Sequence, residues 1–262
     1  MALPDDLPPA RPATPGPSEL DVEVDVEVES ILDDAAWHSL SGPHRHLAEG
    51  SDLALRYPDD VSPFGAVASW EAPGVWDAIR DLVGPAAQFA APPPEVSVPE
   101  GRRVLERISG VQLVQTDALA PLPDPEAVRL GPQDVPEMLD LVARTRPGPF
   151  LPRTIELGRY VGLRREGRLI AMAGERLHPP GWTEISAVCT DPASRGQGIA
   201  TRLVLDVAHH IRDRGDRVLM HASATNERAI GLYLRLGFRL RRTVAFGRML
   251  TPHDVPPRRP PR

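Results

Sequence analysis

The chain has 262 residues, of which 41% are hydrophobic, and a formal net charge of −6 at pH 7, so it can form one large or two modest packed domains and is not generally basic. All 30 basic residues are arginines. Without lysine the chain can form neither a phosphate loop of the GxxxxGKS/T type nor a lysine Schiff base, which excludes P-loop nucleotidases and Schiff-base enzymes.

The two ends and the single cysteine indicate where the protein works. Residues 1–20 hold prolines and acids where a signal peptide would hold basic residues and an apolar run, and no apolar run is long enough to cross a membrane. Cys189 alone cannot form an internal disulfide. We therefore expect a cytoplasmic protein with no membrane or nucleic-acid partner, for which a homodimer is allowed, and Pro-rich disordered tails at 1–20 and 251–262.

Residues 21–116 predict a smaller α+β region. Valines alternate with acids over 22–28, which fits either a strand with one face in water or a solvated acidic tail. The other predicted elements are strands at Leu53–Tyr57 and Phe64–Trp70, a helix at Val75–Val83 closed by Gly84, and a strand region at Val104–Gln115 interrupted by Gly110. A linker with three prolines follows at 117–126.

Residues 127–250 show clearer periodicity and predict an α/β domain with a mixed central sheet in the order βαβββαβαββ. The predicted elements are a strand at Ala127–Leu130, a helix at Pro132–Arg144, a hairpin of Tyr160–Arg164 and Leu169–Arg176, a strand at Thr183–Thr190, a helix at Gln197–Asp213, a strand at Arg217–His221, a helix at Glu227–Leu236, and two final strands at Phe238–Leu240 and Val244–Met249.

The loop TDPASRGQG lies immediately before the helix at 197–213 and favours an anion site. The first N–H groups of a helix lack intrahelical partners, and glycines at 196 and 198 let a phosphate approach the backbone beside Arg195. A tight structural turn is the simpler interpretation of so short a motif. A dinucleotide fold fails in detail, because Thr201 stands at the third glycine position and Asp216 precedes the next strand instead of ending it.

A second motif decides between these interpretations. NERAIGLYLRLGF, which begins at Asn226, follows VCTDPASRGQGIATRL at the separation and in the strand order of the GNAT family of acyl-CoA-dependent N-acyltransferases. Residues 128–250 resemble this family, most closely its FR47-like branch. The resemblance implies the GNAT acyltransferase fold over 127–250 and acetyl-CoA as co-substrate. For the N-terminal region, a degenerate copy of half of the same fold is allowed.

The resemblance also implies the residues that hold the cofactor. The diphosphate would be bound by the loop and the first helical turn, and the pantetheine arm would pair with the end of the preceding strand as an added strand. Asn226 would bond the CoA arm, although an ordinary N-cap explains it equally simply. The implied cofactor-binding residues are Ala187, Val188, Cys189, Arg195, Gly196, Gln197, Gly198, Ile199, Ala200, Thr201 and Asn226.

Two residues match the family's catalytic positions. Glu184 stands where many members carry a glutamate that accepts the proton of the amine, with Glu175 in reserve, although a strand glutamate can also simply pair with an arginine. Tyr233 stands where the family has its phenolic acid, two helical turns after Asn226, although it can also be a core residue. Cys189 fits a buried strand thiol better than an acyl-accepting nucleophile, and the histidines at 38, 44 and 46 lack the ligand spacing of a metal site.

These motifs together predict an acyl-CoA-dependent N-acetyltransferase. The acetyl group would pass directly from acetyl-CoA to a primary amine on a small molecule or peptide. The alternative is a non-catalytic acyl-CoA-binding sensor or regulatory protein.

Overall fold

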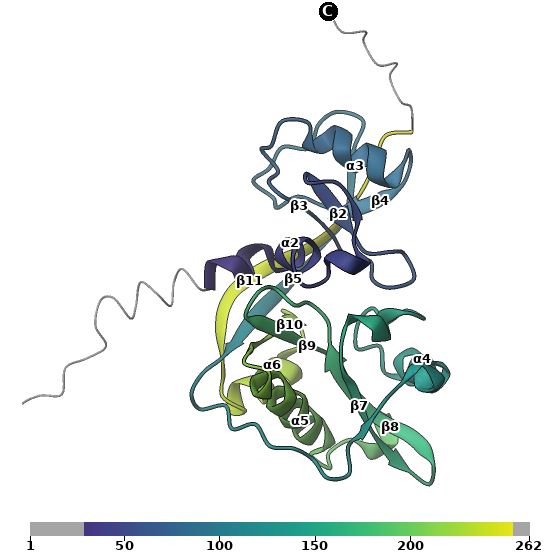
Figure 1. Cartoon of the computed structure of the whole chain (residues 1–262), viewed down its shortest axis with the longest axis vertical. Coiled ribbons are helices and arrows are strands. Elements are labelled where there is room, and N and C mark those ends of the chain that lie inside the picture. Colours follow the sequence, from purple (N-terminus) through teal and green to yellow (C-terminus); the bar gives the residue numbers. More distant parts are fainter. Residues whose placement is uncertain (1–28, 254–262) are drawn as a thin grey trace, which may run out of the picture.

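The computed structural model describes residues 29–253, which form a large mixed sheet and a small antiparallel one (Figure 1). The valine repeat at 22–28 and most of the two predicted tails lie outside these residues. Among the described residues, no helix is both long and apolar enough to cross a membrane. The elements are η1 (Ile31–Asp34), α2 (Ala35–Ser41), η2 (Arg45–Leu47), β1 (Glu49–Gly50), β2 (Ala54–Arg56), β3 (Gly65–Val67), α3 (Val75–Val83), β4 (Gln88–Ala90), β5 (Arg103–Gln115), β6 (Val128–Arg129), η3 (Pro132–Asp134), α4 (Val135–Thr145), η4 (Thr154–Leu157), β7 (Tyr160–Arg165), β8 (Arg168–Glu175), β9 (Trp182–Thr190), η5 (Pro192–Ser194), α5 (Ile199–Asp213), β10 (Arg217–Ser223), α6 (Glu227–Arg235) and β11 (Phe238–Leu250).

The large sheet confirms the predicted α/β class. Its eight strands lie in the order β4-β11-β5-β10-β9-β8-β7-β6, and β9 and β10 are parallel neighbours. Helices α5 and α6 pack on one face, where Leu203, Val207 and Tyr233 join the largest core cluster. Helix α4 covers β7 to β9 on the opposite face through Met138 and Leu141. The sheet is thus covered on both sides, as expected for strands joined by helical crossovers.

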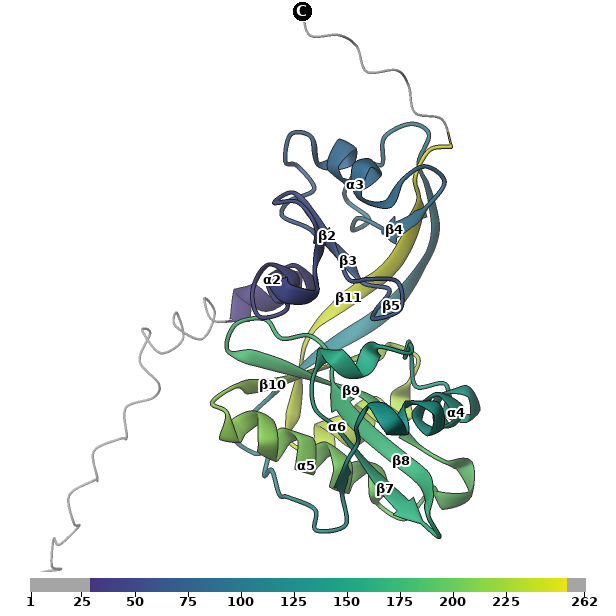
Figure 2. The same ribbon diagram turned by 45° about the vertical axis from the view of Figure 1, so that its right-hand side comes forward.

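The N-terminal region lies against the sheet on the same side as α4. Leu32 of η1 packs with Val114, Trp182 and Leu219, whose side chains face away from α5. Strands β2 and β3, with α3, form a second core that includes Met249 of β11. The views in Figures 1 and 2 show β5 and β11 running together from this region into the lower half of the molecule. The interpretation of this region as a degenerate copy of half of the same fold stays a prediction.

The long strands β5 and β11 differ from what the sequence predicts. Val104–Gln115 was expected within the N-terminal region, yet β5 lies inside the large sheet between β10 and β11. The two expected final strands are one strand, β11, whose register shifts between Leu240 and Arg242. Gly110 does not interrupt β5, which is continuous over 103–115. A Cβ built on Gly110 would lie 2.5 Å from the Phe246 ring. Glycine instead lets the two long strands approach each other.

The proline-rich segment at 117–126 is held against α5. Arg202 donates to both carboxylate oxygens of Asp124 at 2.7 Å, and the Asp124 N–H donates to Asp206 at 2.9 Å. The Leu122 N–H also donates to the carbonyl of Leu205. This segment therefore connects β5 to β6 within one sheet and is fixed along α5, unlike a free linker between two units.

We expect Gly110→Val to destabilise the protein by roughly 1 to 3 kcal/mol, because overpacking against Phe246 and the Ala222 carbonyl must push the two strands apart. Urea unfolding measures the change. Ser109→Val, at the exposed neighbouring position, is the matched control and should shift the free energy of unfolding by less than about 0.5 kcal/mol. Equal effects of the two substitutions would contradict the close approach of the strands.

Candidate functional site

The site begins where the parallel strands β9 and β10 separate. They pair from Trp182 and Arg217 as far as Ile185 and Met220, and β10 pairs with no residue of β9 beyond that point. Strand β10 continues to pair with β5 through Ser223, and β9 remains beside β8 through Thr190. The strands therefore part without loss of their outer neighbours, and the edge of β9 that faced β10 is left open.

A bulge in β9 explains the separation. The pairs Met172 with Cys189 and Gly174 with Ser186 place an extra residue on β9. Ala187 has φ +54°, an uncommon left-handed conformation for a residue other than glycine. Bulges add twist and redirect a strand, which turns the end of β9 away from β10. The strand end carries Ala187, Val188 and Cys189, the three residues expected to pair with the pantetheine arm.

The loop after β9 leaves a row of backbone donors free. Within residues 29–253, no acceptor is recorded for the N–H groups of residues 196–201, and the first helical bond of α5 joins Arg202 to the Gly198 carbonyl. Gly196 and Gly198 have φ +80° and +72°, and a methyl group built on either would meet no atom within 4 Å. The space beside the two glycines is thus open, and the donors lie at the N-terminus of a 15-residue helix, where an anion is favoured.

Local contacts fix the loop without using those donors. Asp191 caps η5 by accepting from the Ala193 N–H at 3.0 Å, and Arg144 of α4 forms an ion pair with Asp191. Arg195 donates to the Thr190 carbonyl at 3.3 Å through Nε and is otherwise exposed. The short helix η5 thus orients the loop, and its glycines supply the left-handed turns.

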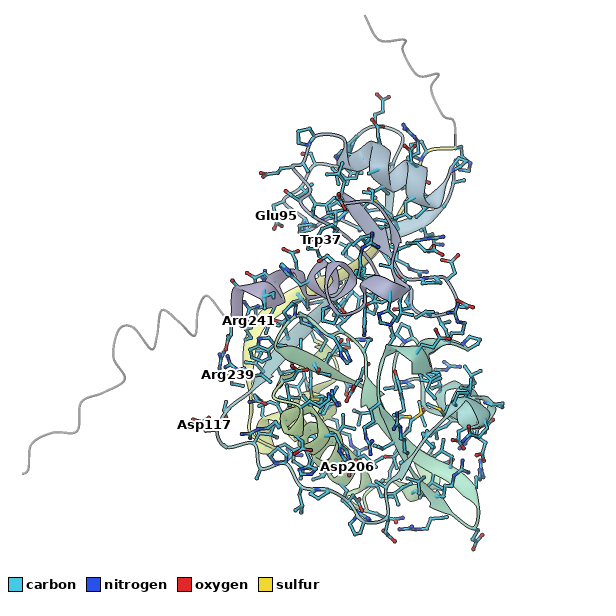
Figure 3. All side chains as sticks on the ribbon, viewed as in Figure 1. Trp37, Glu95, Asp117, Asp206, Arg239 and Arg241 are labelled. Atoms are coloured by element: carbon cyan, nitrogen blue, oxygen red, sulfur yellow. The ribbon has the colours of Figure 1, made fainter. Side chains whose placement is uncertain are left out.

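A cleft of about 1860 Å³ connects this loop with the N-terminal region. Among residues 29–253, five arginines that line it form no ion pair with a carboxylate: Arg107, Arg146, Arg195, Arg228 and Arg235. Trp37 of α2 and Glu95 of the loop after β4 line its other part and lie in the upper half of Figure 3. The cleft is thus formed by both parts of the chain, and it has unpaired positive charges around the loop.

Helix α6 brings Asn226 and Tyr233 to the wall of the cleft. Asn226 is exposed and caps the helix, because its Oδ1 accepts from the Ala229 N–H at 3.2 Å. Tyr233 is 7% exposed, and its burial raises the pKa of the phenol to about 12. The phenol is therefore protonated at neutral pH and can serve as a hydrogen-bond donor, with its ring packed edge-to-face against Phe238.

Glu184 lies at the centre of a buried charge network. Its side chain is 0% exposed, Arg176 donates to both of its oxygens, and His221 Nδ1 lies 2.8 Å from its Oε1. Burial alone would raise the pKa of Glu184, but the Arg176 charge and the hydrogen bonds from both partners outweigh it and lower the pKa to about 2. The carboxylate is charged throughout the neutral range.

The orientation of Gln112 determines which ring nitrogen of His221 accepts a hydrogen bond. Gln112 Oε1 accepts from Arg241 at 2.8 Å, so its amide nitrogen faces the Leu32 carbonyl at 2.9 Å and His221 Nε2 at 3.0 Å. An amide nitrogen only donates, and His221 Nε2 must therefore accept. The imidazole proton is placed on Nδ1, where it is donated to Glu184. Every polar side-chain atom of Glu184, His221 and Gln112 therefore has a partner.

This geometry does not suit Glu184 to direct contact with an amine. The carboxylate does not line the cleft, and a group with a pKa of about 2 is a weak base. The reserve candidate, Glu175, is 2% exposed and accepts from Arg214 and from the Arg159 N–H. Cys189 is 7% exposed, and burial raises the pKa of its thiol to about 11, which leaves little nucleophilic thiolate.

No motif in the sequence singles out Arg176, His221 or Gln112. All three line the cleft. Arg176 directly follows β8, His221 lies on β10 and Gln112 lies on β5. Their partners lie 8 to 129 positions away along the chain. The alternation of polar and apolar residues along these strands was the only available indication, and it does not identify partners.

The chain matches a family model and several proteins of known name. The model described as FR47-like protein matches residues 160–246. A mycothiol acetyltransferase of Thermomonospora curvata is 30% identical over 201 residues, which are 75% of this chain and 60% of that protein. One from Mycobacteroides abscessus is 32% identical over 38% of this chain and 32% of its own length. The chain thus spans at most about three fifths of these curated relatives.

Solved structures give a fuller match. One is the crystal structure of a candidate acetyltransferase of the GNAT family, from Novosphingobium aromaticivorans. It aligns with a TM-score of 0.75 and 38% identity, over 84% of this chain and 97% of that one. A second structure, from Kribbella flavida, aligns with a TM-score of 0.56 and 20% identity over 84% and 95% of the two chains, which shows a shared fold.

We expect Glu184→Gln to lower the free energy of unfolding at pH 7 by roughly 3 kcal/mol, because it leaves the Arg176 charge without its partner. Since the folded pKa of Glu184 is lowered from 4.5 to about 2, its contribution is present above pH 4.5 and is lost as the pH falls toward 2. The difference between the two proteins in urea unfolding should therefore shrink over that range.

Glu137→Gln is the control, because it removes a half-exposed carboxylate that is paired with Arg164 and should cost less than about 1 kcal/mol. A difference for Glu184→Gln as small as this, or one independent of pH, would show that Glu184 is not stabilised by the buried pair.

Proposed function

Because the chain belongs to the GNAT family of acyl-CoA-dependent N-acyltransferases, we propose that it transfers an acetyl group directly from acetyl-CoA to a primary amine. The observation that carries this proposal is the row of unpaired N–H groups at residues 196–201, beside the open edge of β9. A diphosphate supplies acceptors for the first feature, and the amide groups of pantetheine suit the second. A cytoplasmic location is part of the proposal, supported by the single, buried cysteine.

The proposed cofactor contacts follow the two parts of the site. Backbone N–H groups of Gly196, Gln197, Gly198, Ile199, Ala200 and Thr201, with the side chain of Arg195, hold the phosphates. Ala187 to Cys189 pair with the pantetheine arm and thereby position the thioester. Asn226 already accepts from its own helix through Oδ1, and its amide nitrogen is free to donate to the CoA arm.

The proposed reaction is one displacement at the thioester carbon. The amine nitrogen forms a bond to the carbonyl carbon, the bond from that carbon to sulfur breaks, and the amine loses a proton. A backbone N–H near Val188 or Cys189 stabilises the developing oxyanion. Tyr233 donates its phenolic proton, in a hydrogen bond or by transfer, to the departing thiolate.

The reaction also needs an acceptor for the proton of the amine. A lysine-like amine at pH 7 costs about 4 to 5 kcal/mol to deprotonate, so the reaction needs a base or an amine of lowered pKa. Glu184 as that base stays a prediction from the family resemblance. Its burial and its two partners favour an indirect effect, in which it fixes Arg176 and the imidazole of His221.

The acceptor is not taken from the curated relatives. They are named mycothiol acetyltransferases, but this chain spans at most about three fifths of their length. The rival function, a non-catalytic acyl-CoA sensor, is not favoured, since these relatives and the solved neighbour are all described as acetyltransferases.

We expect Gly198→Asp to weaken acetyl-CoA binding at least about 100-fold in isothermal titration, because a carboxylate would occupy the space of the diphosphate and repel it. Gly167→Asp is the matched control, since Gly167 has φ +78° and open surroundings in the hairpin of β7 and β8. It should bind acetyl-CoA normally. Absence of binding by the unaltered protein would overturn the proposed function.

Tyr233→Phe should lower kcat about 100-fold and leave the Kd for acetyl-CoA within about threefold, because it removes the proton donor and keeps the ring in the core. Thiol release in the presence of a panel of primary amines measures the rate. An unchanged kcat would assign Tyr233 to the core alone.

A further inference from the structure

Arg176 presents part of a buried guanidinium to the cleft. The residue follows β8, its side chain is 12% exposed, and its guanidinium carbon lies 4.9 Å from the centre of the Phe64 ring. Both Arg176 and Phe64 line the cleft. The ring and the ion pair with Glu184 hold the guanidinium plane in one orientation.

Only one edge of this guanidinium is occupied. Nε donates to Glu184 Oε2 at 2.9 Å, and Nη2 donates to Oε1. An arginine has five N–H donors, and within residues 29–253 no acceptor is recorded for Nη1 or for the outer N–H of Nη2. These remaining donors form a second fork in the same plane, whose geometry matches a carboxylate.

The acidic side chains that line the cleft do not supply that carboxylate. Asp33 accepts from Arg242 at 2.6 Å, and Glu106 accepts from Arg248 at the same distance. Glu95 and Asp34 are exposed, and neither forms an ion pair with Arg176. The second fork is therefore available to a molecule that enters the cleft.

The charge balance limits what this molecule can be. Glu184 already neutralises Arg176, so a lone carboxylate would bring an unbalanced negative charge into a partly buried site. A molecule that carries both an amine and a carboxylate arrives without net charge. The fork lies beside the paired part of β9, on the side of the N-terminal region and away from the glycine loop at 190–198. This placement separates the acceptor from the phosphates.

We propose that the free edge of Arg176 binds a carboxylate of the acceptor, so that the acceptor is an amine that also carries a carboxylate group, as in an amino acid. Phe64 then forms one wall of the acceptor site, and the N-terminal region completes the substrate pocket. This inference rests on the proposed acetyl transfer.

The test uses the full chain, acetyl-CoA and matched pairs of acceptors, namely a panel of amino acids and the carboxamide of each one. We expect kcat/KM to be at least about tenfold higher for the best amino acid than for its carboxamide, with most of the difference in KM, because the carboxamide replaces a charge-assisted fork by a weaker contact. Equal or higher kcat/KM for the carboxamides would overturn the inference while acetyl transfer stands. Absence of thiol release with every amine would overturn the transferase function and this inference with it.

A double variant then tests Arg176 itself. Arg176→Gln with Glu184→Gln removes both charges, so neither is left buried and unpaired. We expect the preference for carboxylate over carboxamide to fall to about onefold, with the Kd for acetyl-CoA within about threefold of the unaltered protein. Arg107→Gln is the control, because Arg107 lines the same cleft and donates to the Pro92 carbonyl, and it should keep the preference. A preference retained in the double variant would overturn the role of Arg176; if that variant fails to fold, the acceptor pairs decide alone.

Discussion

The site depends on the point at which β9 and β10 stop pairing. A sheet interior normally satisfies every backbone donor and acceptor, and an open row there costs free energy unless water or a ligand fills it. Here the row can stay open because β8 and β5 hold the two strands from outside, and because the bulge at Ala187 directs β9 away from its neighbour. The same turn of β9 leads directly into the loop that starts α5.

The charged side chains in the cleft are organised in two different ways. Around the glycine loop at 190–198, arginines such as Arg146 and Arg228 have no carboxylate partner within residues 29–253 and remain able to contact phosphates. Beside the paired part of β9, Arg176 and Glu184 neutralise each other in a buried pair, and Gln112 and His221 extend it. The first arrangement suits binding of a highly charged group, and the second gives fixed geometry with little net charge.

Local patterns predicted those parts of the molecule that local interactions determine. The helix Val75–Val83 has the predicted bounds because Gly84 ends it, and the order of elements from β6 to α6 follows their periodicity. The place of β5 between β10 and β11 could not be predicted, since pairing across more than a hundred residues leaves no pattern in either strand. Glu184 shows the same limit at the site: a strand glutamate looks alike in sequence whether it faces solvent or, as here, a buried arginine.

The strand order of the large sheet also determines when the fold can form during synthesis. Strand β11 pairs with both β4 and β5, so the ribosome must release the chain through residue 250 before either strand acquires this neighbour. Until then the nascent chain exposes the edge of a 13-residue strand, β5, which is a template for pairing with other chains. Protection by a chaperone is most useful to this protein in that interval.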